Sequence, residues 1–262
     1  VLRIRPDGSE LETYTEMTRN IVDIGITPTL DMFSRDNTND GKGWNTRFLH
    51  YTSLSNPGYP RLYKNFEDEL APPLADYGGG AGTGILYLSE PGFPKDYGET
   101  LFSCDWTTGS LYRHVLKPFE ATYTIAQETF QKVPHAIDLD VDGNSRLYLA
   151  DWRGGGFSYA GKGKQVGLIQ LIEPVGTQRA HYVDVNKVDD AQLVKLLASD
   201  STVQRLEASR RIIDGKKKDL APAVLALAQD ESQHLYHRVA AVFTYKQVLG
   251  KESTPGLVGL VK

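Results

Sequence analysis

The sequence is poor in cysteine and has no long apolar run. Cys104 is the only cysteine among the 262 residues, which excludes a disulfide framework, a cysteine-based zinc site and a CxxCH haem attachment within this chain. The apolar runs are far shorter than a membrane-spanning helix requires. The first residues, VLRIRPDGSE, lack the charged and then apolar pattern of a signal peptide, and they predict a strand and a turn.

The sequence also lacks an excess of positive charge. Its formal net charge is −4, and residues 187–262 carry 12 basic and 9 acidic side chains, against 17 basic and 24 acidic in residues 1–186. Without a broad basic surface there is no electrostatic basis for binding nucleic acid. What is present is 40% hydrophobic residues, enough for packed cores in a globular protein.

The composition changes at about residue 187. Residues 1–186 hold 21 of the 25 glycines, 11 of the 13 prolines and 12 of the 14 tyrosines, a mixture typical of short strands joined by tight turns. From Asp189 on, apolar residues recur at helical spacing. The sequence therefore predicts a multidomain chain: an all-β domain over 1–186 and an all-α domain over 187–262.

A repeated pattern in the first part predicts a β-propeller. Three segments place an aspartate after two apolar or aromatic residues and a two-residue spacer, at Asp36, Asp105 and Asp151. The last two aspartates are 46 residues apart, which suits a four-stranded propeller blade, and the first two are 69 apart, one blade plus an insertion. We expect about three blades here and, because a ring needs about 4 to 8, further blades before Val1.

The second part predicts paired helices. Candidate helices cover about 190–198, 202–214, 219–229 and 233–249, and the second helix of each pair carries a related motif, RLEA at 205–208 and RVAA at 238–241. The offset of 33 residues is typical of a helical repeat, and the small alanine allows close packing. We predict a HEAT-like repeat.

A polar stretch, RDNTNDGKGWNT over residues 35–46, is a candidate cation site. It is interpreted as a loop that concentrates Asp36, Asn37, Asn39 and Asp40, whose carboxylate and amide oxygens are the ligands that Ca²⁺ recruits. The match to an EF-hand is partial, since Arg47 stands at the twelfth position. The alternative is a turn that only caps a blade.

Other candidates lie where propeller side chains face a central channel. Arg19 and Asn20 precede a predicted strand and offer donors and an amide for a polar ligand, or Arg19 pairs with a surface acid. His135 stands at the equivalent position of another blade, as a base, a ligand or a structural histidine. Arg153 is a possible channel or rim residue. His234 and His237 share a helical spacing but lack an acidic third ligand, so they predict no metal site.

The stretch YGGGAGTG over residues 77–84 invites comparison with a phosphate-binding loop. No Lys-Ser or Lys-Thr pair follows it, and it does not join a strand to a helix. We interpret it as a glycine-rich crossing between blades or a lining of the channel.

The segment MTRNIVDIGITPTLDMFSRDNTNDGKGWNTRFLHY resembles the core of the soluble quinoprotein sugar dehydrogenases, which are glucose/sorbosone dehydrogenase-like propellers. GETLFSCDWTTGSLYRHVLKP and HAIDLDVDGNSRLYLADW are similar to the next and the final blade of that family. The resemblance implies that Arg19 and Asn20 contact pyrroloquinoline quinone (PQQ) and that residues 36–43 lie near Ca²⁺. The quinone-contacting lysine of the family falls near Thr107, and His135 and Ala136 stand where its arginines are expected.

The order of propeller and HEAT-like helices resembles large secreted bacterial proteins that continue into a c-type haem domain. This resemblance implies an oxidoreductase acting on a sugar or other polyol, a periplasmic or secreted location, and electron transfer to a haem domain outside this chain. A c-type cytochrome domain or another protein would dock on the helices. The alternative is a scaffold without catalysis that binds a carbohydrate or a protein. Because the family's catalytic histidine lies in an earlier blade, we expect this chain alone to be inactive.

Overall fold

The structure is a computed structural model that describes residues 1–39, 44–61, 63–153, 166–177 and 180–261. It consists of two compact units. Unit 1 contains residues 1–88, 100–140 and 147–172, and unit 2 contains residues 89–99, 141–146 and 173–262. The boundary at about residue 187 stays a prediction.

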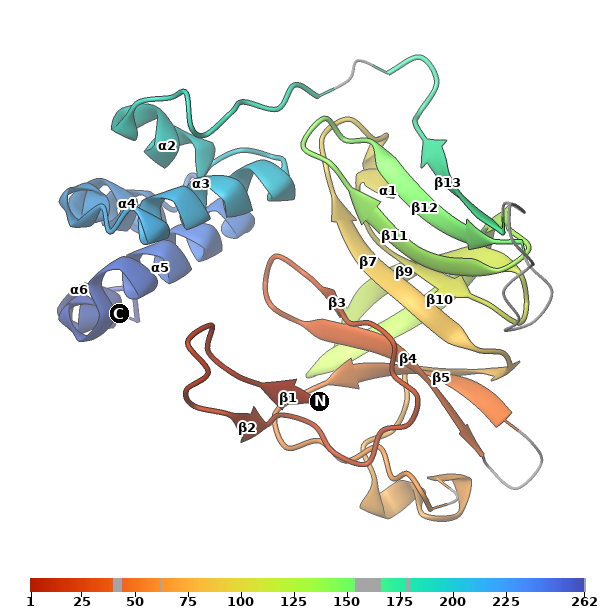
Figure 1. Ribbon diagram of the computed structural model, residues 1–262. Coiled ribbons are helices and arrows are strands. Elements are labelled where there is room, and N and C mark those ends of the chain that lie inside the picture. The colour runs from red at the N-terminus through yellow and green to blue at the C-terminus, as the bar shows by residue number, and fades with distance from the viewer. Residues whose placement is uncertain (40–43, 62, 154–165, 178–179, 262) are drawn as a thin grey trace. The chain divides into compact units, whose positions relative to one another are not determined.

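Unit 1 is built from three separate sheets and a short hairpin (Figure 1). In each sheet the strands are hydrogen-bonded in the order in which they occur along the chain. The hairpin pairs β1 with β2, and two 3-10 turns, η1 and η2, lie between β5 and β6. The strands and turns are β1 Leu2–Arg3, β2 Glu12–Thr13, β3 Gly25–Ile26, β4 Met32–Asn39, β5 Trp44–Tyr51, η1 Tyr63–Asn65, η2 Glu67–Glu69, β6 Ala75–Gly79, β7 Gly82–Ser89, β8 Glu99–Asp105, β9 Ser110–Phe119, β10 Thr122–Lys132, β11 Ala136–Val141, β12 Leu147–Trp152 and β13 Gly167–Ile172.

The three sheets confirm the three repeats predicted from the sequence. Sheet 1 contains β3 to β6, sheet 2 contains β7 to β10, and sheet 3 contains β11 to β13 among the residues described. Asp36, Asp105 and Asp151 lie in equivalent strands, β4, β8 and β12, which are each second in their sheet. The sequential order of the strands is that of propeller blades.

Strand β7 lies where the three sheets approach one another. The backbone N–H of Ile85 donates to Oδ2 of Asp23 in the segment before sheet 1 (3.0 Å), and Oγ1 of Thr83 donates to the carbonyl oxygen of Ala136 in sheet 3 (2.8 Å). A Cβ on Gly84 would collide with Asp138. The glycine-rich crossing therefore connects sheets 1 and 2, as predicted, and its glycines allow close approach of backbones.

Aromatic and aliphatic side chains fill the space between sheets 1 and 2. Phe33, Phe48, Ile85 and Leu101 are at most 4% exposed and form one cluster. Burying a side chain of this kind stabilises the fold by about 1.5–3 kcal/mol. This core fixes the two sheets that carry most of the candidate site.

Residues 35–39 and 44–46 lie in strands and not in the predicted loop. Strand β4 continues to Asn39 and β5 begins at Trp44, with Asp36 paired to Arg47 and Asn37 to Thr46. Because successive side chains of a strand point to opposite faces, Asp36 and Asn37 diverge and do not converge on one cation. The side chain of Asn39 and all of Asp40 lie outside the described residues.

Unit 2 contains helices that agree closely with the predicted ranges. A short helix, α1 Lys95–Gly98, belongs to the segment 89–99, and Ser201 caps α3 by accepting from the Gln204 N–H. The C-terminal helices and turns are α2 Asp190–Leu196, α3 Thr202–Asp214, η3 Lys218–Leu220, α4 Ala221–Gln229, α5 Leu235–Leu249, η4 Gly250–Ser253 and α6 Thr254–Val258.

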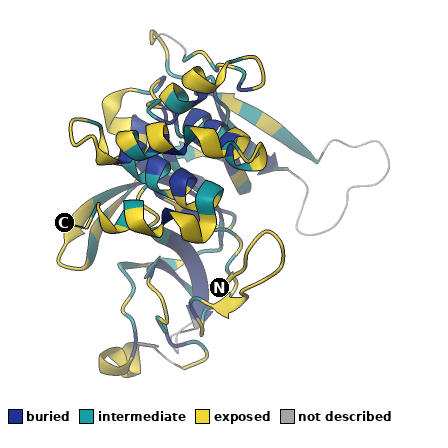
Figure 2. Ribbon diagram, turned by 90° about the vertical axis from the view of Figure 1, so that its left-hand side faces the viewer, coloured by how far each residue is buried: buried dark blue, intermediate teal, exposed yellow. Residues whose placement is uncertain are grey.

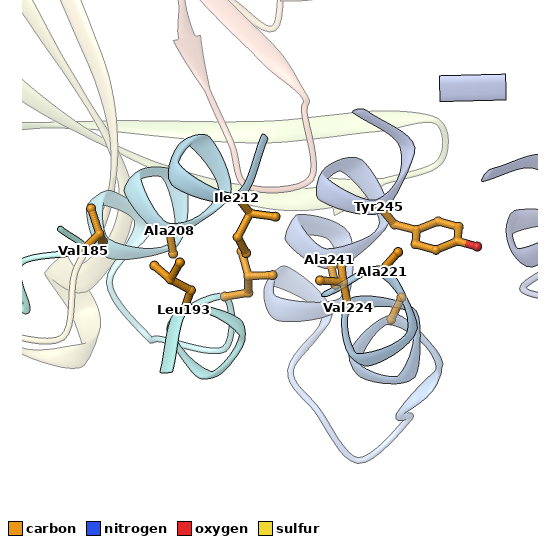
Figure 3. Close-up of a cluster of buried hydrophobic side chains, with 10 residues drawn as sticks. Val185, Leu193, Ala208, Ile212, Ala221, Val224, Ala241 and Tyr245 are labelled. Carbon is orange, nitrogen blue, oxygen red and sulfur yellow. The ribbon is translucent and has the colours of Figure 1, made fainter. Parts of the chain in front are cut away.

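The helices share one apolar core (Figure 3). Leu193 of α2, Ile212 of α3 and Val224 of α4 are at most 1% exposed, and each helix also carries an exposed face (Figure 2). The alanines of the two repeated motifs, Ala208 and Ala241, are fully buried in this core, which confirms that the small residue serves helix packing. The assignment to the HEAT type stays a prediction. In the described part of the chain, no helix combines the length and the apolar character needed to cross a membrane.

The fully buried His114 makes unit 1 sensitive to acid. Its Nε2 contacts Oγ of Ser103 (2.7 Å), and burial together with the positive Arg35 holds its pKa well below the usual 6.5. Below about pH 6.5, His114 therefore binds a proton in the unfolded chain but stays neutral in the folded chain.

We expect the free energy of unfolding to fall by up to about 1.4 kcal/mol per pH unit below about pH 6.5 because of His114. Denaturant unfolding between about pH 7 and pH 5 measures how steeply the free energy of unfolding falls with pH. In His114→Gln this fall should be less steep, because one proton fewer is taken up on unfolding. Equal slopes in the two proteins would refute the assignment.

A second prediction concerns Gly84. In Gly84→Ala the new Cβ collides with Oδ1 and with the backbone of Asp138, so the two sheets must separate locally. We expect a loss of about 1–3 kcal/mol in the free energy of unfolding. Gly79→Ala is the matched control, since no atom lies within 4 Å of its Cβ, and it should change stability little.

Candidate functional site

The candidate site lies where the second strand of each sheet ends. Each of these strands holds a buried aspartate, and Asp36, Asp105 and Asp151 are 0%, 0% and 1% exposed. A buried carboxylate is stable only when donors satisfy its oxygens. The partners of the three carboxylates therefore determine how the neighbouring segments are held.

Asp36 is held mainly by the side chain of Arg47, and the backbone N–H of Arg19 also donates to it. Nε of Arg47 donates to Oδ1 (2.9 Å) and Nη2 donates to Oδ2, while Nη1 binds the carbonyl oxygen of Pro57 (2.6 Å). Burial raises the pKa of Asp36, and the guanidinium of Arg47 opposes that rise. Arg47 donates to both oxygens of this fully buried carboxylate, so Asp36 forms a buried ion pair in this structure.

Asp105 connects sheets 1 and 2. Its Oδ2 accepts from Nη2 of Arg35 in β4 (2.9 Å), and its Oδ1 accepts from the backbone N–H groups of Ala81 (3.2 Å) and Thr108 (2.9 Å). Arg35 is itself 3% exposed and lies near the ring of Tyr112. This carboxylate positions the segments on both sides of the cleft described next.

A cleft of about 610 Å³ opens at this end of sheets 1 and 2. Its lining consists of Arg19, Asn37, the backbone of residues 79–81, and Thr107. Three residues predicted from widely separated parts of the sequence, Arg19, Asn37 and Thr107, are thus brought together, which is what a ligand site requires.

Asn37 holds two walls of the cleft. Its Oδ1 and its carbonyl oxygen accept from Nη1 of Arg19 (2.6 and 3.0 Å), and its Nδ2 donates to the carbonyl oxygen of Gly80 (2.7 Å). Asn37 is 8% exposed. Asn20 is exposed, has a positive φ of 55° and does not line the cleft.

A group of rings continues from the cleft to sheet 3. The rings of Trp106 and His135 have centroids 4.4 Å apart at an interplanar angle of 36°, and Trp152 follows at 6.5 Å from Trp106. The backbone N–H of Trp106 donates to the carbonyl oxygen of Ala81 in the cleft wall (2.9 Å). The two tryptophans each follow one of the buried aspartates directly.

The tautomer of His135 follows from its contacts. Its Nδ1 lies 3.0 Å from the carbonyl oxygen of Trp152, and a carbonyl oxygen only accepts, so Nδ1 carries the proton in the neutral ring. Nε2 is then the nitrogen able to accept a proton. Asp151 fixes this arrangement by accepting from the backbone N–H of His135 (3.3 Å) and from Nε of Arg153 (2.7 Å).

The structure brings part of the predicted set together. Arg19, Asn37 and Thr107 line the cleft, whereas His135 precedes β11 and Arg153 follows β12, and both donate to the carboxylate of Asp151. In the described ranges, no group of three or more His, Cys, Asp or Glu side chains is placed to hold a metal ion. The rings of Trp106 and Trp152 were not predicted as site residues, although their position after the repeated aspartates is a signal that could have identified them.

The sequence matches no family model and no curated protein. Among solved structures, it is similar to an oxidoreductase of Thermus thermophilus described as a glucose dehydrogenase, with 18% identity over 62% of this chain and 47% of that one and a TM-score of 0.50. A PQQ-bound aldose sugar dehydrogenase of Streptomyces coelicolor matches with 16% identity over 65% of this chain and 51% of that one, with a TM-score of 0.49.

Unit 1 resembles part of a propeller dehydrogenase. At this identity the likeness shows the fold alone. The chain spans about half the length of these two structures. The helices that follow are established by the structure itself.

We predict that the carboxylate of Asp105 is required for the stability of unit 1. Asp105→Asn leaves the buried Arg35 without its countercharge, which costs roughly 3–5 kcal/mol in the free energy of unfolding. Asp68→Asn changes an exposed aspartate and should stay within about 0.5 kcal/mol of the parent. Denaturant unfolding compares the two, and similar stabilities would contradict the role given to Asp105.

Proposed function

We propose that unit 1 is part of a PQQ-dependent dehydrogenase that oxidises a sugar or another polyol in the periplasm or outside the cell. In this proposal electrons leave through a haem domain outside the chain. The observation that carries it is the cleft in which Arg19, Asn37 and Thr107 meet at the ends of two propeller-like sheets. The likeness in fold to a glucose dehydrogenase supports the same class.

The cleft has chemistry that suits one end of PQQ, which is a planar tricarboxylate. Arg19 supplies a guanidinium, which binds carboxylates in a planar geometry, and Thr107 is exposed and supplies a hydroxyl. The backbone of residues 79–81 has no side chain larger than a methyl, so a flat ring system can approach it closely. Arg153 beside His135 provides a second cation near this end of the sheets.

The described residues do not provide a Ca²⁺ site of the predicted kind. The Asp36 carboxylate accepts hydrogen bonds from Arg47, and the side chain of Asn37 is hydrogen-bonded to Arg19 and to the carbonyl oxygen of Gly80. A hard cation takes about 6 to 8 oxygen ligands, so a calcium site would depend on groups other than these two. Calcium binding at Asp36 therefore has no geometric support.

The residues of this chain have defined tasks under the proposal. When bound, PQQ supplies a quinone that accepts the electron pair of the substrate alcohol. Arg19 and Thr107 hold its polar edge, and Asn37 keeps Arg19 oriented. Nε2 of His135 is the candidate to accept the hydroxyl proton of a substrate bound beside the rings.

A specific observation favours a second candidate, the carbohydrate-binding scaffold. Within the described residues, the cleft lining has one cationic side chain, Arg19, and that side chain already binds Asn37. The rings of Trp106, His135 and Trp152 provide a stacking surface that a sugar can use without any cofactor. In this version the helices of unit 2, if they are HEAT-like, offer a surface for a partner protein.

The experiment is a calorimetric titration of the full-length protein, stripped of metal, first with Ca²⁺ and then with PQQ. We expect PQQ to bind, and we expect Arg19→Ala to weaken this binding at least about tenfold, because a guanidinium contact to a carboxylate is lost. Arg3→Ala is the matched control, since Arg3 is exposed on the β1–β2 hairpin.

The outcomes separate the two candidates. PQQ binding that depends on Arg19 and not on Arg3 supports the dehydrogenase. Absence of PQQ binding, with a sugar bound in a manner that Trp106→Ala abolishes, refutes the dehydrogenase and supports the scaffold.

A further inference from the structure

Unit 2 contains a cavity that the function of unit 1 does not involve. It has a volume of about 250 Å³ and lies between the segment 89–99, the turn before α3 and the first turn of α5. At a water's share of about 30 Å³ this is the volume of roughly eight waters, which suits a molecule of amino-acid size. Its lining combines side chains of both charges with the rings of Phe93 and Tyr236.

The positive side of the cavity is centred on Arg205. This side chain is 3% exposed, and its Nη1 and Nη2 donate to the carbonyl oxygen of Ser199 and to Oγ1 of Thr202 (2.6 Å each), while the guanidinium lies 5.8 Å from the centre of the Tyr236 ring. None of the described carboxylates lies within ion-pair distance of Arg205. Burial lowers the pKa of Arg205, and Glu90, Asp200 and Glu99 oppose this lowering from a longer distance. Because no described carboxylate contacts the guanidinium directly, a carboxylate of a ligand can do so.

The start of α5 contributes to the same side. This 15-residue helix begins at Leu235, and His234, Tyr236 and His237 around its first turn line the cavity. The N-terminus of a helix carries partial positive charge. His237 is 7% exposed, and its Nδ1 has no hydrogen-bond partner among the described residues.

The negative side of the cavity consists of Glu99 and Asp200. Both are exposed, and Oδ1 of Asp200 lies 3.5 Å from Nε2 of His237. The third carboxylate, Glu90, is 3% exposed and is already engaged, because its Oε1 accepts from the N–H of Val203 at the start of α3 (3.1 Å). Two carboxylates therefore remain at the rim of the cavity.

We propose that this cavity binds a small zwitterion of the α-amino acid class. The carboxylate of the ligand lies between Arg205 and the first turn of α5, and its ammonium group is directed to Glu99 and Asp200.

The charges exclude simpler ligands. An inorganic anion beside Arg205 would be repelled by Glu99 and Asp200 without any compensating attraction, and a simple cation would be repelled by Arg205, Lys95 and the end of α5. In a zwitterion, the attraction of the ammonium group to Glu99 and Asp200 offsets the repulsion of its carboxylate. A metal ion is disfavoured because the described residues offer no group of three metal-binding side chains. A zwitterion matches both halves of the lining at once.

The test is calorimetric titration of the full-length protein with each of the common amino acids. We expect at least one to bind, and we expect acetate and methylamine, which each carry one of its charges, to bind at least about tenfold more weakly. Glu99→Gln should weaken amino-acid binding about tenfold, since it removes a charge that contacts the ammonium group. Glu231→Gln, which changes an exposed glutamate away from the cavity, should leave binding unchanged.

Arg205 also supports the fold, so its loss could unfold α3, and the decisive variants are therefore those of the exposed Glu99 and Asp200. The proposal is overturned if no amino acid binds, if acetate binds as tightly as the amino acid, or if the combined Glu99→Gln and Asp200→Asn protein binds as tightly as the parent. Loss of amino-acid binding in that double variant, with an unchanged melting temperature, supports it.

Discussion

The arrangement of unit 1 depends on a carboxylate buried near the end of the second strand of each sheet. A carboxylate at 0–1% exposure is stable only when neighbouring groups donate hydrogen bonds to it. These bonds position the segments that carry the donors. Asp105 thereby holds both Ala81 of the cleft wall and Arg35 of the preceding sheet, and Asp151 holds His135 and Arg153. The hydrogen bonds to Asp105 and Asp151 thus position the wall of the cleft and the rings beside it.

Much of this fold could be predicted from the sequence. The repeated aspartates located the three sheets, because each blade buries one aspartate at the same place and the spacing of these residues is therefore the spacing of the blades. Helical periodicity located α2 to α5. The hairpin β4–β5 was missed because Asp36 to Asp40 have the composition of a turn. The strand forms there because Arg47 and Asp36 are buried together across the ladder, a tertiary gain that local propensity does not report.

The site could be predicted in part for the same reason. Arg19 was identified from its position before a predicted strand and Thr107 through a family resemblance, and the structure places both in one cleft. Asn37 was identified, but it was grouped with Asp36 as a metal ligand because sequence proximity hides the alternation of side chains along a strand. The contact of His237 with Asp200 joins residues 37 positions apart, with α3 and α4 between them in the sequence, and no periodicity within one helix could have indicated it.

The partners of the three aspartates also differ in a way that bears on cooperativity. Asp105 reaches across to Arg35, so sheets 1 and 2 share a buried charge pair and neither can open without exposing it. The carboxylate of Asp151 is held by His135, Arg153 and Gln170 of its own sheet. The described contacts between this sheet and sheet 2 include a hydroxyl hydrogen bond from Thr83, a side-chain amide hydrogen bond from Gln131 to Gln170, the ring contact of Trp106 with His135, and close glycine packing. Separating sheets 2 and 3 would therefore leave the carboxylate of Asp151 with its partners, whereas separating sheets 1 and 2 would break a buried ion pair.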